Sequence, residues 1–191
     1  GHCKALAPTW EDVAKSFEAE PDVVVAKVDA DAHRELGSRF DVSGFPTLKF
    51  FSRGDDKDAE PYNGGRDGDA LVEFLNGKAG TQRVLGGGLT DDAGRLADYD
   101  DFARKFMANG NLREDILAEA TAAMDVLDDK EIKFATFYTK AMKKVLAKGD
   151  DYVTSEIKRL EGMLESDAVS AKKKTLFGLR RNVLDAFTPQ Q

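Results

Sequence analysis

Cysteine and histidine are scarce in this chain, and their scarcity limits its chemistry. Among 191 residues there are one cysteine and two histidines. A single cysteine cannot form an internal disulfide, so the cysteine count alone does not assign a redox compartment. Cys3, His2 and His33 are too few, and wrongly spaced, for a zinc site. We therefore expect neither a bound metal nor a cofactor.

Long apolar runs and an excess of positive charge are also missing. No stretch approaches the roughly 18 consecutive apolar residues of a membrane span. The 28 basic and 35 acidic side chains give a net charge of -7, which argues against nucleic-acid binding. A basic run near the C-terminus, Lys172 to Lys174 with Arg180 and Arg181, could meet an anionic surface. In so acidic a chain, such a run on a helix more often forms a solvated face.

The N-terminus lacks an initiator methionine and the basic and apolar segments of a signal peptide. We therefore expect a processed product, a fragment or an incomplete gene product. The first residues, Gly1-His2-Cys3-Lys4, look like the tail of a Cys-Gly-His-Cys-Lys redox site whose leading cysteine lies outside the chain. That pattern predicts a cysteine immediately before Gly1 in a parent sequence.

Cys3 stands at the start of a predicted helix. After it, Leu6, Trp10, Val13 and Phe17 follow at spacings of four, three and four, which predicts a helix from Ala5 to Glu20 bent at Pro8. A helix N-terminus favours the thiolate form of a cysteine. The alternative is an inert buried cysteine, the commoner role for an unpaired one.

The first half of the chain alternates strand and helix patterns. Its expected elements are a buried parallel strand at Val23–Val28, a helix at Ala32–Phe40, a strand at Thr47–Phe51, an edge strand at Ala59–Tyr62 and a helix at Ala70–Asn76 that ends at Gly77. Gly86 to Gly88 then interrupt the pattern. A glycine run can hold phosphate, but no strand precedes it and no Lys-Ser/Thr follows, so we expect a linker.

From Arg95 onward the apolar period is helical. Five amphipathic stripes run from Leu96 to Phe106, Leu112 to Leu127, Ile132 to Val145, Val153 to Leu164 and Leu176 to Phe187. Each has one apolar face with charge opposite, as in helices that bury one side in a bundle. The second half is therefore predicted to be a compact all-α domain.

Three stretches together resemble a known family. They are residues 1–8, the run from Val23 to Asp31, and Val42 to Phe51 with its Phe45-Pro46 pair, and they look like the thioredoxin-type catalytic domain of a protein disulfide isomerase. The resemblance implies an α/β thioredoxin-like domain at 1–85, incomplete at its N-terminus because the first strand, a helix and the central strand are missing. A linker at 86–94 and the five-helix D domain of one isomerase group at 95–191 would follow.

The resemblance also implies roles for particular residues. Cys3 would be the resolving cysteine, and His2, between the two cysteines of the motif, would stabilise a thiolate; otherwise His2 is an exposed polar residue near a chain end. Arg66 would swing toward the site and favour the Cys3 thiolate, unless it is an ordinary loop charge. Pro46 would be cis rather than a common turn proline, and would present the Phe45 backbone to an extended substrate strand.

The implied function is that of an enzyme. It would be a thiol-disulfide oxidoreductase and isomerase of the endoplasmic reticulum lumen, acting on cysteines of unfolded or misfolded secretory proteins and on upstream redox partners. Because exchange and resolution need two sulfurs, the chain as given is expected to be weakly active or inactive. The alternative is a non-catalytic binding or escort module built on the helical domain.

Overall fold

The computed structural model describes residues 1–54 and 58–189. The chain divides into two compact units, Gly1–Gly88 and Leu89–Gln191. Within the described ranges, no helix is both long and apolar enough to cross a bilayer. The break between the units falls inside the predicted linker, whose limits at 86 and 94 stay a prediction.

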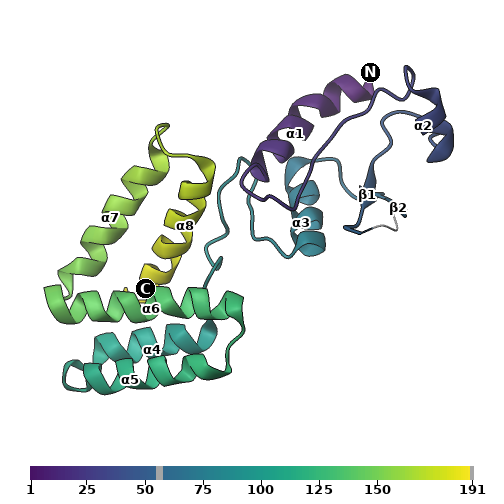
Figure 1. Cartoon of the computed structure of the whole chain (residues 1–191). Coiled ribbons are helices and arrows are strands. Elements are labelled where there is room, and N and C mark those ends of the chain that lie inside the picture. The colour runs from purple at the N-terminus through teal and green to yellow at the C-terminus, as the bar shows by residue number, and fades with distance from the viewer. Residues whose placement is uncertain (55–57, 190–191) are drawn as a thin grey trace. The chain divides into compact units, whose positions relative to one another are not determined.

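Unit 1 contains three helices and one small sheet in its described part (Figure 1). The elements are α1 (His2–Ser16), α2 (Arg34–Arg39), β1 (Lys49–Phe51), β2 (Ala59–Pro61) and α3 (Gly68–Ala79). The two strands are antiparallel, with Phe50 opposite Glu60. The core lies between α1 and α3, where Leu6, Val13 and Phe17 pack with Leu71 and Val72.

The predicted buried strand at Val23–Val28 is wrong. The stretch is extended but belongs to no ladder, and Val24 and Val28 are 85% and 63% exposed. Val23 and Val25 do pack against the core, so the stretch has the alternation of a strand with one face inward. A strand needs a hydrogen-bonded neighbour. Within the described residues no backbone hydrogen bond reaches Val24 through Val28, which explains why the strand does not form.

Several element boundaries also differ from the sequence predictions. Helix α1 begins at His2 and ends at Ser16, and it continues through Pro8, which has no N–H to donate to the carbonyl of Lys4. Helix α3 runs through Gly77 and ends at Gly80, whose left-handed backbone (φ 64°) terminates it. The strands and α2 are one or more residues shorter than predicted.

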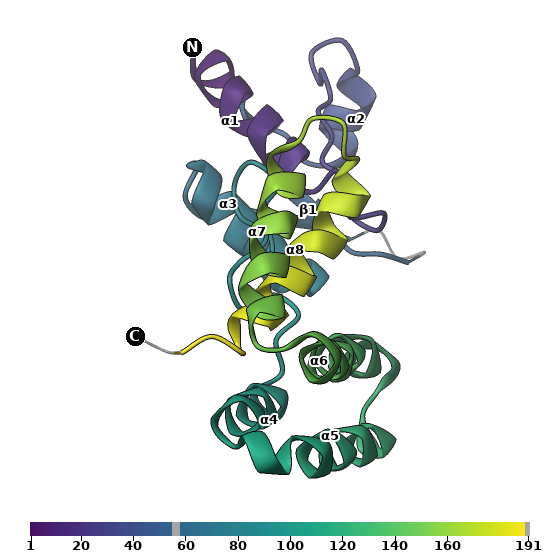
Figure 2. The ribbon, with the colours of Figure 1, turned by 90° about the vertical axis from the view of Figure 1, so that its left-hand side faces the viewer.

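Unit 2 is all-helical, as predicted. Its α-helices are α4 (Ala97–Ala108), α5 (Arg113–Ala122), α6 (Asp129–Lys148), α7 (Asp151–Glu165) and α8 (Ala171–Asp185), and short 3-10 turns flank α5 at Gly110–Leu112 and Ala123–Val126. Figures 1 and 2 show α4 and α5 beside α6, and α7 paired with α8. A larger core than that of unit 1 joins them, centred on Tyr99, Phe106, Tyr138, Met142 and Leu160.

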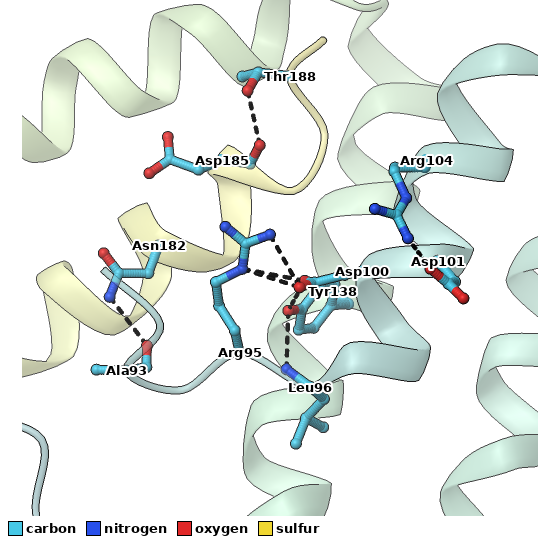
Figure 3. A network of polar contacts seen from close by, with 10 residues as sticks. All are labelled: Ala93, Arg95, Leu96, Asp100, Asp101, Arg104, Tyr138, Asn182, Asp185 and Thr188. Atoms are coloured by element: carbon cyan, nitrogen blue, oxygen red, sulfur yellow. Dashed lines mark hydrogen bonds and ion pairs between the residues drawn. The ribbon is translucent and has the colours of Figure 1, made fainter. Parts of the chain in front are cut away.

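A polar network fixes the start of α4 against α6. The carboxylate of Asp100 accepts from Arg95 (Nη2 to Oδ2, 2.9 Å) and from the Tyr138 hydroxyl (2.5 Å). That hydroxyl in turn accepts from the backbone N–H of Leu96 at 3.2 Å. Figure 3 shows Arg95 and Tyr138 converging on Asp100. Burial, with the bond to Asp100, raises the pKa of Tyr138 far above its usual value, so the hydroxyl stays protonated and donates.

We predict that Asp100→Asn lowers the free energy of unfolding by about 1–2 kcal/mol, because the half-buried Arg95 loses its ionic partner and the hydrogen bonds lose charge. The measurement is urea unfolding of the full chain followed by far-UV circular dichroism. Asp98→Asn is the matched control, since Asp98 is an exposed residue of the same helical turn. Equal losses for both variants would show that the network contributes nothing.

Candidate functional site

Cys3 is the second residue of α1, at the helix start. The backbone N–H of Ala5 donates to the carbonyl of Gly1 at 3.2 Å, so the helical turn closes around the cysteine. Its thiol is free and the residue is exposed. An exposed sulfur in the first turn of a 15-residue helix lies near unsatisfied N–H groups, which favour a negative charge.

Cys3 lies at the edge of an apolar groove of about 380 Å³. Most of its lining is aliphatic or aromatic and comes from four segments: α1, the stretch 26–30, α2 with the residues after it, and β1 with the turn leading into it. Trp10, Phe40 and Phe51 are among these side chains, and Phe40 packs edge-on against Phe51 with ring centroids 5.2 Å apart. The groove therefore offers an apolar surface directly beside the sulfur.

Phe45 and Pro46 form part of the same groove. The Phe45–Pro46 peptide bond is cis, as the resemblance implied. The Thr47 hydroxyl donates to the carbonyl of Gly44 at 2.6 Å and so closes the turn around the proline. Phe45 is 56% exposed, so its ring is accessible from solvent beside the groove.

Arg66 reaches the turn rather than the cysteine. Its Nη2 donates to the carbonyl of Pro46 at 3.3 Å, and no hydrogen bond to Cys3 occurs among the residues that the structure describes. The loop before Arg66 is held by Tyr62, whose hydroxyl donates to the carbonyl of Gly65 at 2.7 Å. A Cβ on Gly64 would come within 2.6 Å of that hydroxyl, so a larger residue there would require the Tyr62 side chain to move.

Sequence comparison gives two family matches. Residues 1–77 match the thioredoxin family, and residues 94–187 match the family described as endoplasmic reticulum protein ERp29, C-terminal domain. The chain joins a thioredoxin region to an ERp29-type domain. The ERp29-type domain corresponds to unit 2, and the thioredoxin region lies within unit 1.

Similar proteins are named protein disulfide isomerases. The chain is 44% identical to a probable protein disulfide-isomerase A6 of Medicago sativa and 43% identical to protein disulfide-isomerase erp38 of Neurospora crassa, over 98% of its length in both cases. It is 42% identical to protein disulfide isomerase-like 2-2 of Oryza sativa subsp. japonica, again over 98% of its length. The chain spans about half the length of these relatives, 51%, 51% and 50% respectively.

The thioredoxin region brings together most of the predicted site residues. Cys3, Phe45 and Pro46 share the groove, and Arg66 is bonded to its proline turn. His2 is exposed and does not line the groove. In the described part of the chain, no three His, Cys, Asp or Glu side chains form a group able to hold a metal ion.

Sequence reasoning missed the apolar lining of the groove. The sequence patterns place Trp10 on one face of a predicted helix, Phe40 at the end of another and Phe51 at the end of a predicted strand. Their apolar periodicity predicts that these side chains face inward. It does not say whether they pack against another strand or line an open groove. Trp10 is the only tryptophan in the chain, which makes it a natural reporter of the groove.

The ERp29-type domain has its own pocket of about 320 Å³ between α6, α7 and α8. Apolar and cationic side chains line it: Phe137, Lys140, Ala141, Tyr152, Leu176, Arg180, Val183 and Leu184. No acidic side chain is part of this lining. The Arg180 guanidinium also contacts Glu156 at 3.0 Å. The pocket can therefore hold an apolar group that has a negative charge next to it.

We predict that Cys3 reacts faster with N-phenylmaleimide than with a sulfonated maleimide of similar intrinsic reactivity, because the apolar reagent gains contacts in the groove. Phe45→Ser should reduce the rate ratio about threefold. Stopped-flow labelling at pH 7, followed by Trp10 emission, measures both rates. Leu112→Ser, at a residue of unit 2 that is 51% exposed, is the control and should leave the ratio unchanged. A ratio of one in the unmodified chain would contradict an apolar site beside the sulfur.

Proposed function

We propose that the chain takes part in thiol-disulfide exchange during oxidative protein folding, with Cys3 as its reacting group. The observation that carries this proposal is the position of Cys3, exposed at a helix start and beside the groove that contains Phe45 and Pro46. The similarity to proteins named protein disulfide isomerases supports the same chemistry.

The substrates we propose are cysteine-containing unfolded or misfolded secretory proteins. The endoplasmic reticulum lumen is the proposed compartment, since one matching family is described as an endoplasmic reticulum protein and disulfides persist in oxidising compartments. Redox partners would exchange electrons with the same sulfur. The groove suits an extended apolar segment, which an unfolded chain exposes and a folded one hides.

The reaction starts when the Cys3 thiolate attacks one sulfur of a disulfide. One S–S bond forms, the original S–S bond breaks, and the leaving sulfur departs as a thiolate that takes up a proton. The product is a mixed disulfide between Cys3 and the substrate. The attacking sulfur lies in the first turn of α1, beside the N–H groups at the start of the helix.

Resolution of the mixed disulfide needs a second thiol. The 191 residues contain no other cysteine, so this thiol must come from the substrate or from another molecule. In the family to which the resemblance points, a cysteine before Gly1 would attack first and Cys3 would release it. We therefore propose that the 191-residue chain captures disulfides but turns over slowly, and that Arg66 and His2 tune the site only secondarily.

The test compares four proteins on a scrambled-disulfide substrate: the chain, Cys3→Ser, a chain with one cysteine placed immediately before Gly1, and that extended chain carrying Cys3→Ser. We expect reductant-sensitive covalent complexes from the first and none from the second. The two-cysteine protein should refold the substrate at least about tenfold faster than the single-cysteine ones, because resolution becomes intramolecular. Arg53→Gln, at an exposed arginine paired with Asp22, serves as a surface control.

Covalent complexes that persist in Cys3→Ser would show that another group reacts. Equal refolding by the chain and the two-cysteine protein would contradict the two-sulfur mechanism. Each result can be scored on non-reducing gels and by recovery of substrate activity.

A second candidate function is non-covalent binding of unfolded proteins by the ERp29-type domain. The specific observation is the pocket of α6, α7 and α8, whose lining combines apolar side chains with Lys140 and with Arg180, which is paired with Glu156. Charge complementarity selects a segment in which an apolar side chain lies next to a carboxylate. Cys3 takes no part in such binding.

For this candidate we predict that Leu176→Asp weakens binding about five- to tenfold, because it puts a negative charge into the apolar pocket. The probe is a reduced, carboxymethylated unfolded protein, which has no thiol to exchange, and binding is measured by fluorescence anisotropy. Leu146→Asp is the matched control, since Leu146 is 41% exposed on α6 but does not line the pocket. Cys3→Ser should bind as the unmodified chain does; equal loss in both aspartate variants would exclude the pocket.

A further inference from the structure

The glycine-rich segment that joins the two units is held by side chains of each unit. Sequence patterns alone suggest a flexible linker, because Gly86, Gly87 and Gly88 follow one another. A glycine run is flexible when its backbone N–H and C=O groups bond to water and not to other parts of the protein. The structure shows that most of this backbone has protein partners, and the partners differ on the two sides of Gly88.

On the side of unit 1, Arg83 anchors the segment. Its side chain is 2% exposed, and its guanidinium donates to the Glu20 carboxylate after α1 (Nε to Oε1, 2.7 Å) and to the carbonyl of Gly87 (3.3 Å). The Asn76 side chain of α3 bonds the Arg83 backbone twice, accepting from its N–H at 2.9 Å and donating to its carbonyl at 2.7 Å. A buried, paired arginine with both backbone groups satisfied does not leave its site easily.

The glycines themselves are fixed to the end of α1. The N–H of Gly86 donates to the Ser16 hydroxyl at 2.9 Å, and that hydroxyl, 1% exposed as a residue, donates to the carbonyl of Asp12 at 2.7 Å. Gly87 has φ of 99°, and a Cβ there would lie 3.3 Å from the carbonyl oxygen of Lys15. These glycines therefore serve close packing on α1 and not only chain mobility.

On the side of unit 2, Asn182 of α8 holds the segment. Its side-chain N–H₂ donates to the carbonyls of Thr90 (2.8 Å) and Ala93 (3.1 Å), and the residue is 4% exposed. Figure 3 shows the bond from Asn182 to Ala93. A Cβ on Gly178 would lie 3.1 Å from a methyl group of Leu89, so that side chain also lies close against α8.

We propose that this segment is a structured clasp with a narrow hinge. Residues 83–87 move with unit 1 and residues 90–93 move with unit 2, so any change in their mutual orientation is confined to the backbone dihedral angles of Gly88 and Leu89, on either side of the planar peptide bond that joins them. The argument rests on buried side chains that satisfy backbone groups, which cost free energy to expose. The hinge is independent of the chemistry proposed for Cys3.

The experiment measures backbone ¹⁵N order parameters and amide hydrogen exchange of the full chain. We expect order parameters near ~0.85 for residues 84–87 and 90–93, with lower values only at Gly88 and Leu89. Ser16→Ala should speed exchange of the Gly86 amide about tenfold or more and leave Ala93 unchanged. Asn182→Ala should lower the order parameters of 90–93 and leave 84–87 unchanged.

Ser155→Ala and Asn111→Ala, at exposed residues of unit 2, are the matched controls and should alter neither stretch. Order parameters below ~0.6 across 84–93 in the unmodified chain would show an ordinary flexible linker and overturn the proposal. Fast exchange at Gly86 before any substitution, or no response to Ser16→Ala, would overturn it for the unit 1 side. No response to Asn182→Ala would overturn it for the unit 2 side.

Discussion

A β-strand forms only where a neighbour satisfies its backbone, and that constraint shapes unit 1. In the β1–β2 pair, the N–H of Tyr62 donates to the carbonyl of Leu48. Successive residues of a strand direct their N–H and C=O groups to opposite sides, so those of Lys49 and Phe51 face away from β2. The extended stretch 24–28 is likewise without backbone partners among the described residues. Both stretches contribute to the lining of one groove, so the unpaired backbone and the apolar side chains of unit 1 meet beside Cys3.

Unit 2 escapes this constraint because its backbone bonds are local. Each helix satisfies its own interior, and the capping box of Asp128 and Glu131 also closes the start of α6 locally. Packing then needs only apolar stripes that face inward, and buried polar groups such as Tyr138 and Asn182 join helices to loops. The helical domain therefore depends less on contacts far apart in sequence than the sheet does.

This difference decides what the sequence could predict. The five apolar stripes of unit 2 predicted α4 to α8, because apolar residues at helical spacing indicate both that a helix forms and which of its faces is buried. The run Val23–Val28 predicted a strand wrongly, because apolar composition reports burial and cannot report whether a partner strand exists. The resemblance predicted the cis bond before Pro46, which no local pattern contains. Neither route found Asn76, Ser16 and Asn182 as anchors of the joining segment, because a polar side chain that bonds a distant backbone leaves no periodic signal.

The geometry around Cys3 also separates two ways of activating a sulfur. A charged side chain must move close to the thiol, whereas the N–H groups at a helix start already lie next to a cysteine in the first turn. Arg66 is engaged with the carbonyl of Pro46, so it would have to break that bond before it could approach Cys3. His2 points to no partner among the described residues, and as the residue directly before Cys3 on a helix it faces a different side. The start of α1 therefore lies beside Cys3 without any rearrangement, while Arg66 in this arrangement holds the turn that contains Pro46.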